Sequence, residues 1–252
     1  MIYLAIETSD PLGSLALFDQ DGVQKEDTFS SEMAHAREFA DRIEGLLGQG
    51  GFTARDLGGI SVSIGPGSYT GCRVGVTAAK TLAMALRIPL VGLSSLEVMA
   101  AFAMESTGPE SGEGDPDSFI PVLDGRRGFF YGAQFRRGDA RRPRRTAEDQ
   151  VAQLAELIGV LEGPAWLLGR GADSFLLSLE DDGGGTGASK YGYSRGPLEW
   201  DQPRAATLAG LSIELLAETS FDQEAIHSLK PAYLRPSEPE IVLARKLAGE
   251  DQ

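Results

Sequence analysis

The chain has 252 residues, of which 42% are hydrophobic, and its formal net charge is −14 at pH 7. This length and composition are enough for one large domain or two smaller lobes with a buried core. No stretch approaches the ~20 apolar residues that a membrane span needs, and the first residues lack the basic region of a secretory signal. We therefore expect a cytoplasmic globular protein, without an internal disulfide because Cys72 is the only cysteine.

The first 105 residues predict an antiparallel meander followed by alternating strands and helices. Apolar residues between positions 32 and 47 fall on one face of a helix, and a glycine-rich turn leads into a second helix at 70–86. The expected strands are residues 3–8, 14–19, 23–29, 59–64 and 88–94, and a third helix is expected at 95–104. This order is typical of an α/β fold in which helices cover a mixed sheet.

A second unit begins after residues 106–118, which lack an apolar pattern and are expected to form a linker or long loop. Residues 120–135 predict two strands that turn near 124–128, repeating the opening of the first unit and indicating an internal duplication. The further expected elements are helices at 148–161 and after 169–174, a strand at 165–169, a flexible loop at 183–187 and a helix at 205–217. We expect an N-terminal lobe of residues 1–105 completed by 204–236, a C-terminal lobe of 106–203, and an acidic tail of 237–252.

The acidic balance argues against a protein that wraps nucleic acid alone, because phosphate binding depends mainly on Lys and Arg. Basic residues nevertheless gather between positions 126 and 145, where eight of the 23 stand beside one acid, Asp139. The candidate contacts to RNA or to an acidic partner are Arg136, Arg137, Arg141, Arg142, Arg144 and Arg145. An arginine run at the end of a hairpin is more often simply solvated, and the sequence favours that interpretation.

The segment SIGPGSYTGCRVGVTAAK, residues 63–80, raises the question of a phosphate site, because glycines at a helix start let an anion approach backbone N–H groups. It is not the loop of nucleotide hydrolases, since Pro66 stands in place of the first glycine and Cys72 in place of the lysine. It is not the dinucleotide fingerprint either, because Thr70 occupies the third glycine position. The glycines must serve another purpose.

Candidate nucleotide-binding residues lie at two related turns and at the start of a helix. They are Glu7, Thr8 and Ser9 after the first strand, Asp124 in the second unit, and Gly169 and Gly171 before a helix. Acidic residues at related turns of two lobes could hold a metal-nucleotide between them. Such residues more often bond their own backbone, and this second interpretation is favoured by sequence alone. With two widely separated histidines, His35 and His227, and one cysteine, no metal site is expected.

The helix at 70–86 has two apolar stripes. The small residues Gly71, Gly75, Ala79 and Ala83 recur every four positions, beside a larger stripe of Val74, Ala78, Leu82 and Leu86. We expect the larger stripe to pack on the sheet and the small one to let another helix come close. That helix could belong to the same chain or to a partner, and the sequence by itself favours the same chain.

Five segments in order resemble the bacterial tRNA threonylcarbamoyladenosine biosynthesis protein TsaB family, also called YeaZ. They are LAIETS, SIGPGSYTGCRVGVTAAKTLA, PLVGLSSLE, VLDGRRGFFYGAQF and PAYLR, and the resemblance as a whole spans residues 2–235. The glycine-rich segment is highly specific, whereas the others are individually weak. The resemblance implies two related lobes of the actin/hexokinase-like (ASKHA) fold.

The resemblance also implies a scaffold role without catalysis or cofactor. TsaB-like proteins pair with TsaD, the subunit that modifies the adenosine beside the tRNA anticodon, and TsaE supplies the associated ATPase. The implied TsaD interface uses the helices at 32–47 and 70–86, with Phe39, Ile43 and the small stripe. Contact with tRNA would occur only through the complex, and a homodimer of the isolated chain stays open. The alternative is an ATP-dependent kinase or ATPase of the same superfold.

The sequence departs from related patterns at several positions. The two histidines of the H-x-x-x-H metal pair in TsaD-like relatives fall on Ser95 and Met99, which do not suit that metal. Glu7 stands where the family usually has Asp, and Gly125 and Phe129 interrupt a D-A-R-x-x-E pattern. The second departure argues against a polar function of the hairpin at 120–135. Neither a zinc motif nor a nucleophile arrangement supports the family's older label of glycoprotease.

Overall fold

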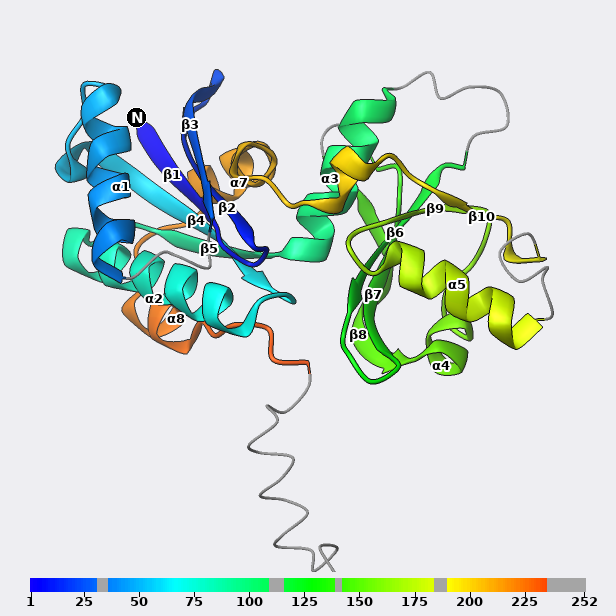
Figure 1. Ribbon diagram of the computed structural model, residues 1–252. Helices are drawn as coiled ribbons and strands as arrows, with labels where there is room; N and C mark the ends of the chain where they lie inside the picture. Colours follow the sequence, from blue (N-terminus) through cyan, green and yellow to red (C-terminus); the bar gives the residue numbers. More distant parts are fainter. Residues whose placement is uncertain (31–35, 109–115, 139–141, 184–189, 235–252) are drawn as a thin grey trace, which may run out of the picture.

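The computed structural model describes residues 1–30, 36–108, 116–138, 142–183 and 190–234. It has two lobes, each built on a five-stranded mixed sheet and lying side by side (Figure 1). The loop expected at 183–187 and the tail expected at 237–252 fall largely or wholly outside these residues. Across the described ranges, no helix is both long and apolar enough to cross a bilayer.

The first sheet has the strand order β3-β2-β1-β4-β5. Its strands are β1 (Ile2–Glu7), β2 (Leu12–Asp19), β3 (Gly22–Ser30), β4 (Leu57–Gly65) and β5 (Leu90–Ser94). The first three form the predicted antiparallel meander, while β4 and β5 run parallel to β1. A short 3-10 turn, η2 (Ala54–Asp56), leads into β4.

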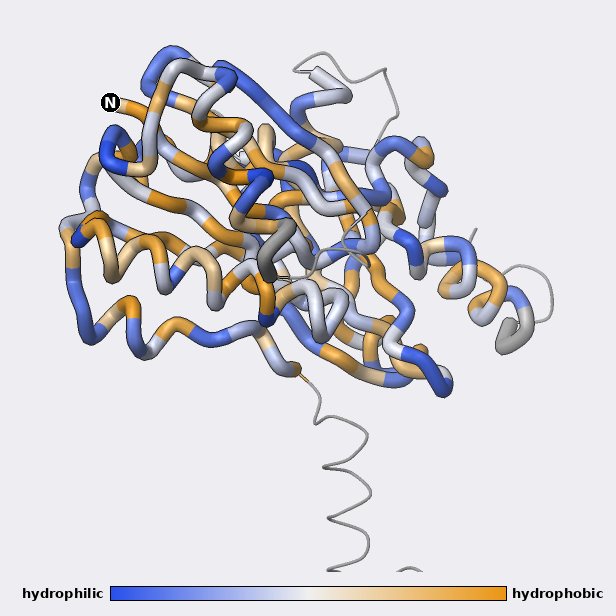
Figure 2. Tube along the Cα trace, turned by 60° about the vertical axis from the view of Figure 1, so that its left-hand side comes forward, coloured by the Kyte–Doolittle hydropathy of each residue, from blue (hydrophilic) through white to orange (hydrophobic). Residues whose placement is uncertain are grey.

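Helices cover both faces of this sheet. On one face lie α1 (Ala36–Gln49), α2 (Tyr69–Leu86) and the short α8 (Gln223–Ser228). On the other face α7 (Ala205–Glu218) packs against β1, β2, β4 and β5, so a segment from near the C-terminus covers the first sheet. Figure 2 shows hydrophobic residues running along the strands and the inward faces of the helices.

The second sheet repeats the first. Its order is β10-β9-β6-β7-β8, formed by β6 (Ser118–Asp124), β7 (Phe129–Arg136), β8 (Arg144–Gln153), β9 (Ala165–Leu168) and β10 (Tyr193–Arg195). Again three antiparallel strands are followed by two parallel ones. Its covering helices are α4 (Leu154–Ile158) and α5 (Ala172–Gly183). The equal strand order confirms the prediction of two related lobes with mixed sheets covered by helices.

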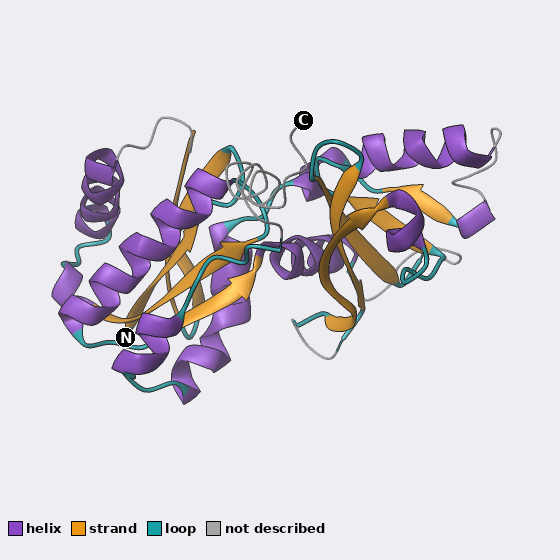
Figure 3. Cartoon of the chain, turned by 90° about the horizontal axis from the view of Figure 1, so that it is seen from below, coloured by secondary structure: helices purple, strands orange, loops and turns teal. Residues whose placement is uncertain are grey.

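The helix α3 (Ser95–Thr107) joins the two lobes by packing on both (Figure 3). Val98 and Ala101 belong to the core of the first lobe, whereas Leu96 and Met99 pack with Phe119 of the second. The short η3 (Leu198–Asp201) adds Trp200 to the same cluster. One helix therefore contributes apolar side chains to a core in each lobe. The domain boundary expected after residue 105 lies inside this helix and stays a prediction.

One predicted helix is wrong. Residues 148–153 continue the edge strand β8, which pairs with β7, and only Leu154–Ile158 is helical. The strand is polar and half-exposed, so it lacks the apolar alternation that identifies strands in sequence. Its backbone hydrogen bonds with β7 determine its structure. The short elements β10, η3 and α8 also lacked a sequence signal.

Candidate functional site

The turn after β1 contains a buried carboxyl. The Glu7 side chain is fully buried, and its Oε1 accepts hydrogen bonds from the backbone N and the hydroxyl of Ser9, both at 2.6 Å. Among the residues described, its Oε2 has no hydrogen-bond partner. Burial raises the pKa of Glu7 to about 7, against the opposing effect of the Ser9 hydrogen bonds. This carboxyl therefore changes its charge near neutral pH.

The glycine-rich segment lies directly against this turn. A Cβ at Gly71 would overlap the carbonyl oxygen of Thr8, and one at Gly75 would overlap the Thr8 hydroxyl. The Thr8 hydroxyl donates to the carbonyl of Gly71 at 2.8 Å, and the backbone N of Ser68 donates to the carbonyl of Ser9 at 2.7 Å. The glycines thus let α2 touch the β1–β2 turn.

The corresponding turn of the second lobe is also used internally. Asp124 accepts from the backbone N of Arg126 at 2.7 Å, and Gly169 donates its N–H to Asp201 at 2.8 Å. A Cβ at Gly171 would lie 2.7 Å from the backbone N of Asp124, so this glycine permits close packing on the end of β6. All of these candidate residues contact their own lobe.

An ion pair connects the two turns. Arg170 lies between Gly169 and Gly171. Its Nε and Nη2 atoms donate to the carboxylate of Asp10, at 2.7 and 2.9 Å. The Asp10 side chain is 5% exposed and that of Arg170 is 46% exposed. The pairing of two ionised groups is bidentate, which fixes their orientation. The structure therefore brings the two predicted turns together across the lobes, and it joins them through residues that sequence analysis did not single out.

The positions related to a histidine metal pair are structural. Ser94 caps α3, and the Ser95 hydroxyl donates to the carbonyl of Pro66, while Met99 is fully buried. In the described part of the chain, no group of three or more His, Cys, Asp or Glu residues could hold a metal ion. Burial and the nearby Glu7 charge raise the pKa of Cys72 to about 12, so its thiol is not an activated nucleophile.

The small-residue stripe packs inward, which corrects our expectation that it faces a partner. Ala79 and Ala83 are fully buried in the first core, and Gly71 and Gly75 contact Thr8. Small side chains allow α2 to approach the sheet closely. The larger residues Val74, Ala78, Leu82 and Leu86, expected on the sheet, are instead partly exposed.

The exposed side of α2 forms a groove with α1. Its volume is about 630 Å³, and its floor contains Phe39, Ile43 and Leu47 of α1, Phe52, and Ala78 and Leu82 of α2. The exposed Thr77 and Thr81 lie along the α2 side. Phe39 and Ile43, predicted to contact a partner, thus line an apolar groove although each is largely covered by its own lobe.

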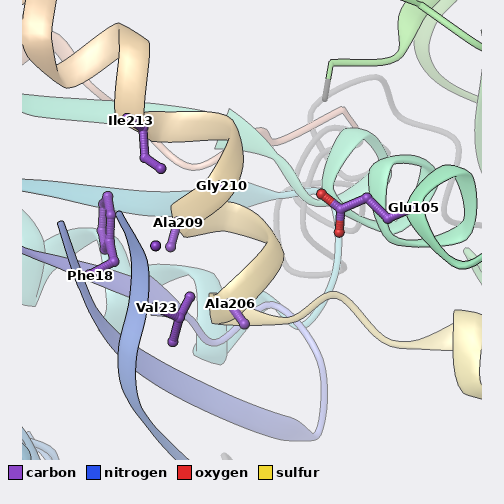
Figure 4. Close-up of a pocket in the computed structure, with 8 residues that line it drawn as sticks. Phe18, Val23, Glu105, Ala206, Ala209, Gly210 and Ile213 are labelled. Carbon is purple, nitrogen blue, oxygen red and sulfur yellow. The ribbon is translucent and has the colours of Figure 1, made fainter. Parts of the chain in front are cut away.

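A second hollow lies on the opposite face of the first sheet (Figure 4). Its volume is about 360 Å³, and it is lined by Phe18, Gly22, Val23, Glu105, Ala206, Ala209, Gly210 and Ile213. Glu105 is the one titratable side chain of this lining, and Figure 4 shows it at the α3 side, away from Phe18 and Ile213. A single carboxyl does not provide an acid–base pair.

Most of the candidate RNA-binding arginines that the structure describes pair with carboxylates. Arg137 bonds Asp117 at 3.0 Å, Arg136 bonds Glu162 at 3.3 Å, and Arg142 bonds Glu97 at 2.8 Å. Arg145 pairs with Asp149 and lies 3.6 Å from Glu97. Arg144 is exposed, and Arg141 lies outside the described residues. These pairings offset much of the positive charge, and a role in RNA contact stays a prediction.

Comparison with known proteins gives consistent matches. The family model for tRNA N6-adenosine threonylcarbamoyltransferase, TsaD, matches residues 29–178. The tRNA threonylcarbamoyladenosine biosynthesis protein TsaB of Bacillus subtilis is 33% identical over 95% of this chain and 96% of its own length. TsaB of Escherichia coli is 28% identical over 55% of this chain and 57% of its own length.

Solved structures agree in fold. YeaZ from Pseudomonas aeruginosa superposes with a TM-score of 0.67, at 20% identity, covering 92% of this chain and 99% of its own. A second Pseudomonas aeruginosa structure, described as similar to peptidase YeaZ, gives a TM-score of 0.69 at 19% identity, covering 93% of this chain and 99% of its own. Together with the repeated sheets, these matches confirm the expected fold class. With a third of its residues identical to the Bacillus subtilis protein over nearly the whole length, the chain belongs to the TsaB (YeaZ) family.

Proposed function

We propose that this chain is a non-catalytic, cytoplasmic scaffold subunit that binds a TsaD-like catalytic subunit. That partner would transfer the threonylcarbamoyl group to the adenosine beside the tRNA anticodon, with a TsaE-like ATPase completing the system. Family membership supports a role in the biosynthesis of this modified nucleoside. The proposal adds the scaffold role and the partners.

The observation that carries the proposal is the groove between α1 and α2. Its floor is apolar, and threonines rather than charged residues stand along its α2 side. An apolar groove between two helices suits an amphipathic helix from another protein. We therefore assign the TsaD-like subunit to this groove.

The contacts that join the two lobes support the absence of catalysis. A kinase of this superfold would open and close its lobes around a nucleotide, whereas here the Asp10–Arg170 ion pair ties the turns of the two lobes together. Packing of α3 on both sheets also favours a fixed arrangement of the lobes over opening and closing. Both features suit a rigid subunit that presents a surface.

Titration of the chain with the TsaD-like subunit of the same genome tests the proposal. Thr77→Arg would place a long charged side chain at the groove without changing the core, because Thr77 is exposed. We expect affinity to fall at least about thirtyfold, as for the loss of a binding hot spot. The control Thr219→Arg alters an exposed threonine after α7, outside the groove, and should bind like the wild type. Equal binding by all three proteins would contradict the proposal.

A further inference from the structure

Acidic residues are unevenly distributed in this chain. Residues 57–96, 125–138 and 225–234 contain no Asp or Glu, although the chain has 37 of them. The basic residues in these stretches are Arg73, Lys80, Arg87, Arg126, Arg127, Arg136, Arg137 and Lys230. Burial of β4 and β5 explains part of the first stretch, but the exposed start of α2 also lacks a carboxylate. Residues 183–198 and 202–213 lack Asp and Glu as well, so the distinguishing feature of the three stretches is that they line one hollow.

These three stretches meet at a small hollow between the lobes. Its lining includes Pro66 and Tyr69 at the start of α2, Tyr131 of β7, and Pro231 and Tyr233 near the C-terminal end of the described chain. Figure 1 shows the segment after α8 running from α2 toward the second lobe. A surface at this place therefore combines residues from both lobes.

Hydrogen bonds hold the C-terminal segment in this position. Lys80 of α2 donates through Nζ to the carbonyls of His227 and Leu229, each at 2.8 Å. The backbone N of Ala232 donates to the carbonyl of Ile64, also at 2.8 Å. These bonds place Tyr233 beside the first turn of α2.

Two tyrosines and an arginine make up the exposed part of this surface. The rings of Tyr69 and Tyr233 have centroids 5.3 Å apart and are 48% and 49% exposed. The Arg73 guanidinium lies 4.9 Å from the Tyr69 ring centroid and donates to its hydroxyl at 3.1 Å. Aromatic rings and guanidinium planes are the groups that stack on unpaired RNA bases and attract phosphates. None of the described residues that line the hollow carries a carboxylate.

We propose that Tyr69, Arg73 and Tyr233 form a contact surface for single-stranded RNA at the interlobe hollow. In the context of the proposed function, on which this inference rests, the RNA is an unpaired loop of the tRNA substrate. RNA and an acidic protein segment are both anionic, so the positive charge of Arg73 suits either one. The two exposed tyrosine rings favour RNA, because unpaired bases can stack on them. The surface differs from the arginine-rich end of the β7–β8 hairpin, where four arginines bond carboxylates.

The test is a fluorescence anisotropy titration of a labelled RNA stem–loop with the full chain at low ionic strength, where screening of its weak positive surface is smallest. Tyr69→Ala should weaken binding about tenfold, as expected for the loss of one stacked base, and Tyr69→Trp should restore it. Arg73→Glu should weaken binding and lower its salt dependence. A fully paired duplex of the same composition should bind less tightly than the stem–loop.

The matched control is Arg55→Glu, which makes the same charge change at an exposed arginine of η2, before the start of β4 and thus at the opposite end of that strand from Ile64. It should bind the stem–loop more tightly than Arg73→Glu does. Equal losses in these two variants, no effect of Tyr69→Ala, or no binding by the wild type would overturn the inference. Loss of TsaD-like subunit binding by Tyr69→Ala in the absence of RNA would also overturn it, since the surface would then be a protein interface. The inference thus departs from the expectation that this acidic chain contacts tRNA only within the complex. Because the titration uses the chain alone, its outcome is independent of whether the groove binds the TsaD-like subunit.

Discussion

Glu7 shows how a single side chain gives the fold a pH dependence. Its ordinary pKa of 4.5 rises to about 7 in the folded chain because burial disfavours the carboxylate. The folded state therefore binds the proton more tightly than the unfolded state does. The stability linked to this proton is complete below pH 4.5 and is lost as the pH rises through 7.

Glu7→Gln should remove this dependence, because the amide keeps the shape and the acceptor for Ser9 but cannot ionise. At pH 8 the variant should be more stable than the wild type by up to about 3 kcal/mol, from the pKa difference. Near pH 4.5 the advantage should vanish. Thermal melting of both proteins across this range measures the effect, and parallel curves would show that Glu7 is not the buried titrating group.

Candidate residues at this scale were only partly predictable. The favoured interpretation of Glu7, Ser9 and Asp124 as partners of their own backbone agrees with the Ser9 and Arg126 hydrogen bonds. The Asp10–Arg170 pair joins positions 160 residues apart, and neither residue stood out by type or spacing. A long-range ion pair leaves no periodic signal in a single sequence. The contact between the rings of Tyr69 and Tyr233 was missed for the same reason.

The helix α2 shows what a glycine can contribute at the scale of an element. Gly75→Ala improves helix propensity by up to about 1 kcal/mol, but its Cβ would overlap the Thr8 hydroxyl. Because β1 holds Thr8 in place, we expect a net lowering of the melting temperature by several degrees. The matched control is Gly45→Ala in α1, where an added Cβ meets nothing within 4 Å.

The Gly45→Ala variant should be unchanged or slightly more stable, because it gains helix propensity without a clash. Equal melting temperatures of the two variants would contradict the close packing of α2 on the β1–β2 turn. The same packing explains a wrong prediction. Periodicity correctly identified two stripes on α2, but we expected the stripe with the larger side chains to pack on the sheet. The stripe with the smaller side chains packs there instead, because the helix lies too close for larger ones.

Element boundaries followed the strength of their local signals. The helix predicted at 70–86 is observed at Tyr69–Leu86, where the Ser68 hydroxyl accepts from Gly71 and Arg87 ends the helix in a left-handed conformation. The edge strand β8 had no such signal, because its polar sequence pairs with β7 through the backbone. Propensity and capping are local, whereas strand pairing depends on the neighbouring strand.

At the scale of the whole molecule, the repeated strand order and the shared α3 favour a rigid body that presents surfaces. The duplication could be predicted because both units begin with a strand, a turn and a strand. The sharing of α3 could not, since its apolar residues surround the helix and do not indicate two separate cores. With the two lobes packed in this way, the α1–α2 groove is an apolar surface of the described chain that stays open to a partner.

We propose that this chain supports tRNA modification by binding a catalytic subunit and performs no chemistry itself. The most direct test of this proposal is reconstitution of threonylcarbamoyladenosine formation with the TsaD-like subunit, the TsaE-like ATPase, tRNA, ATP and a threonylcarbamoyl donor. We predict product with the wild-type chain and with Glu7→Gln, and little product when the chain is omitted or replaced by Thr77→Arg. Loss of product with Glu7→Gln in a complex that still assembles would contradict the claim, because the buried carboxyl would then take part in the reaction.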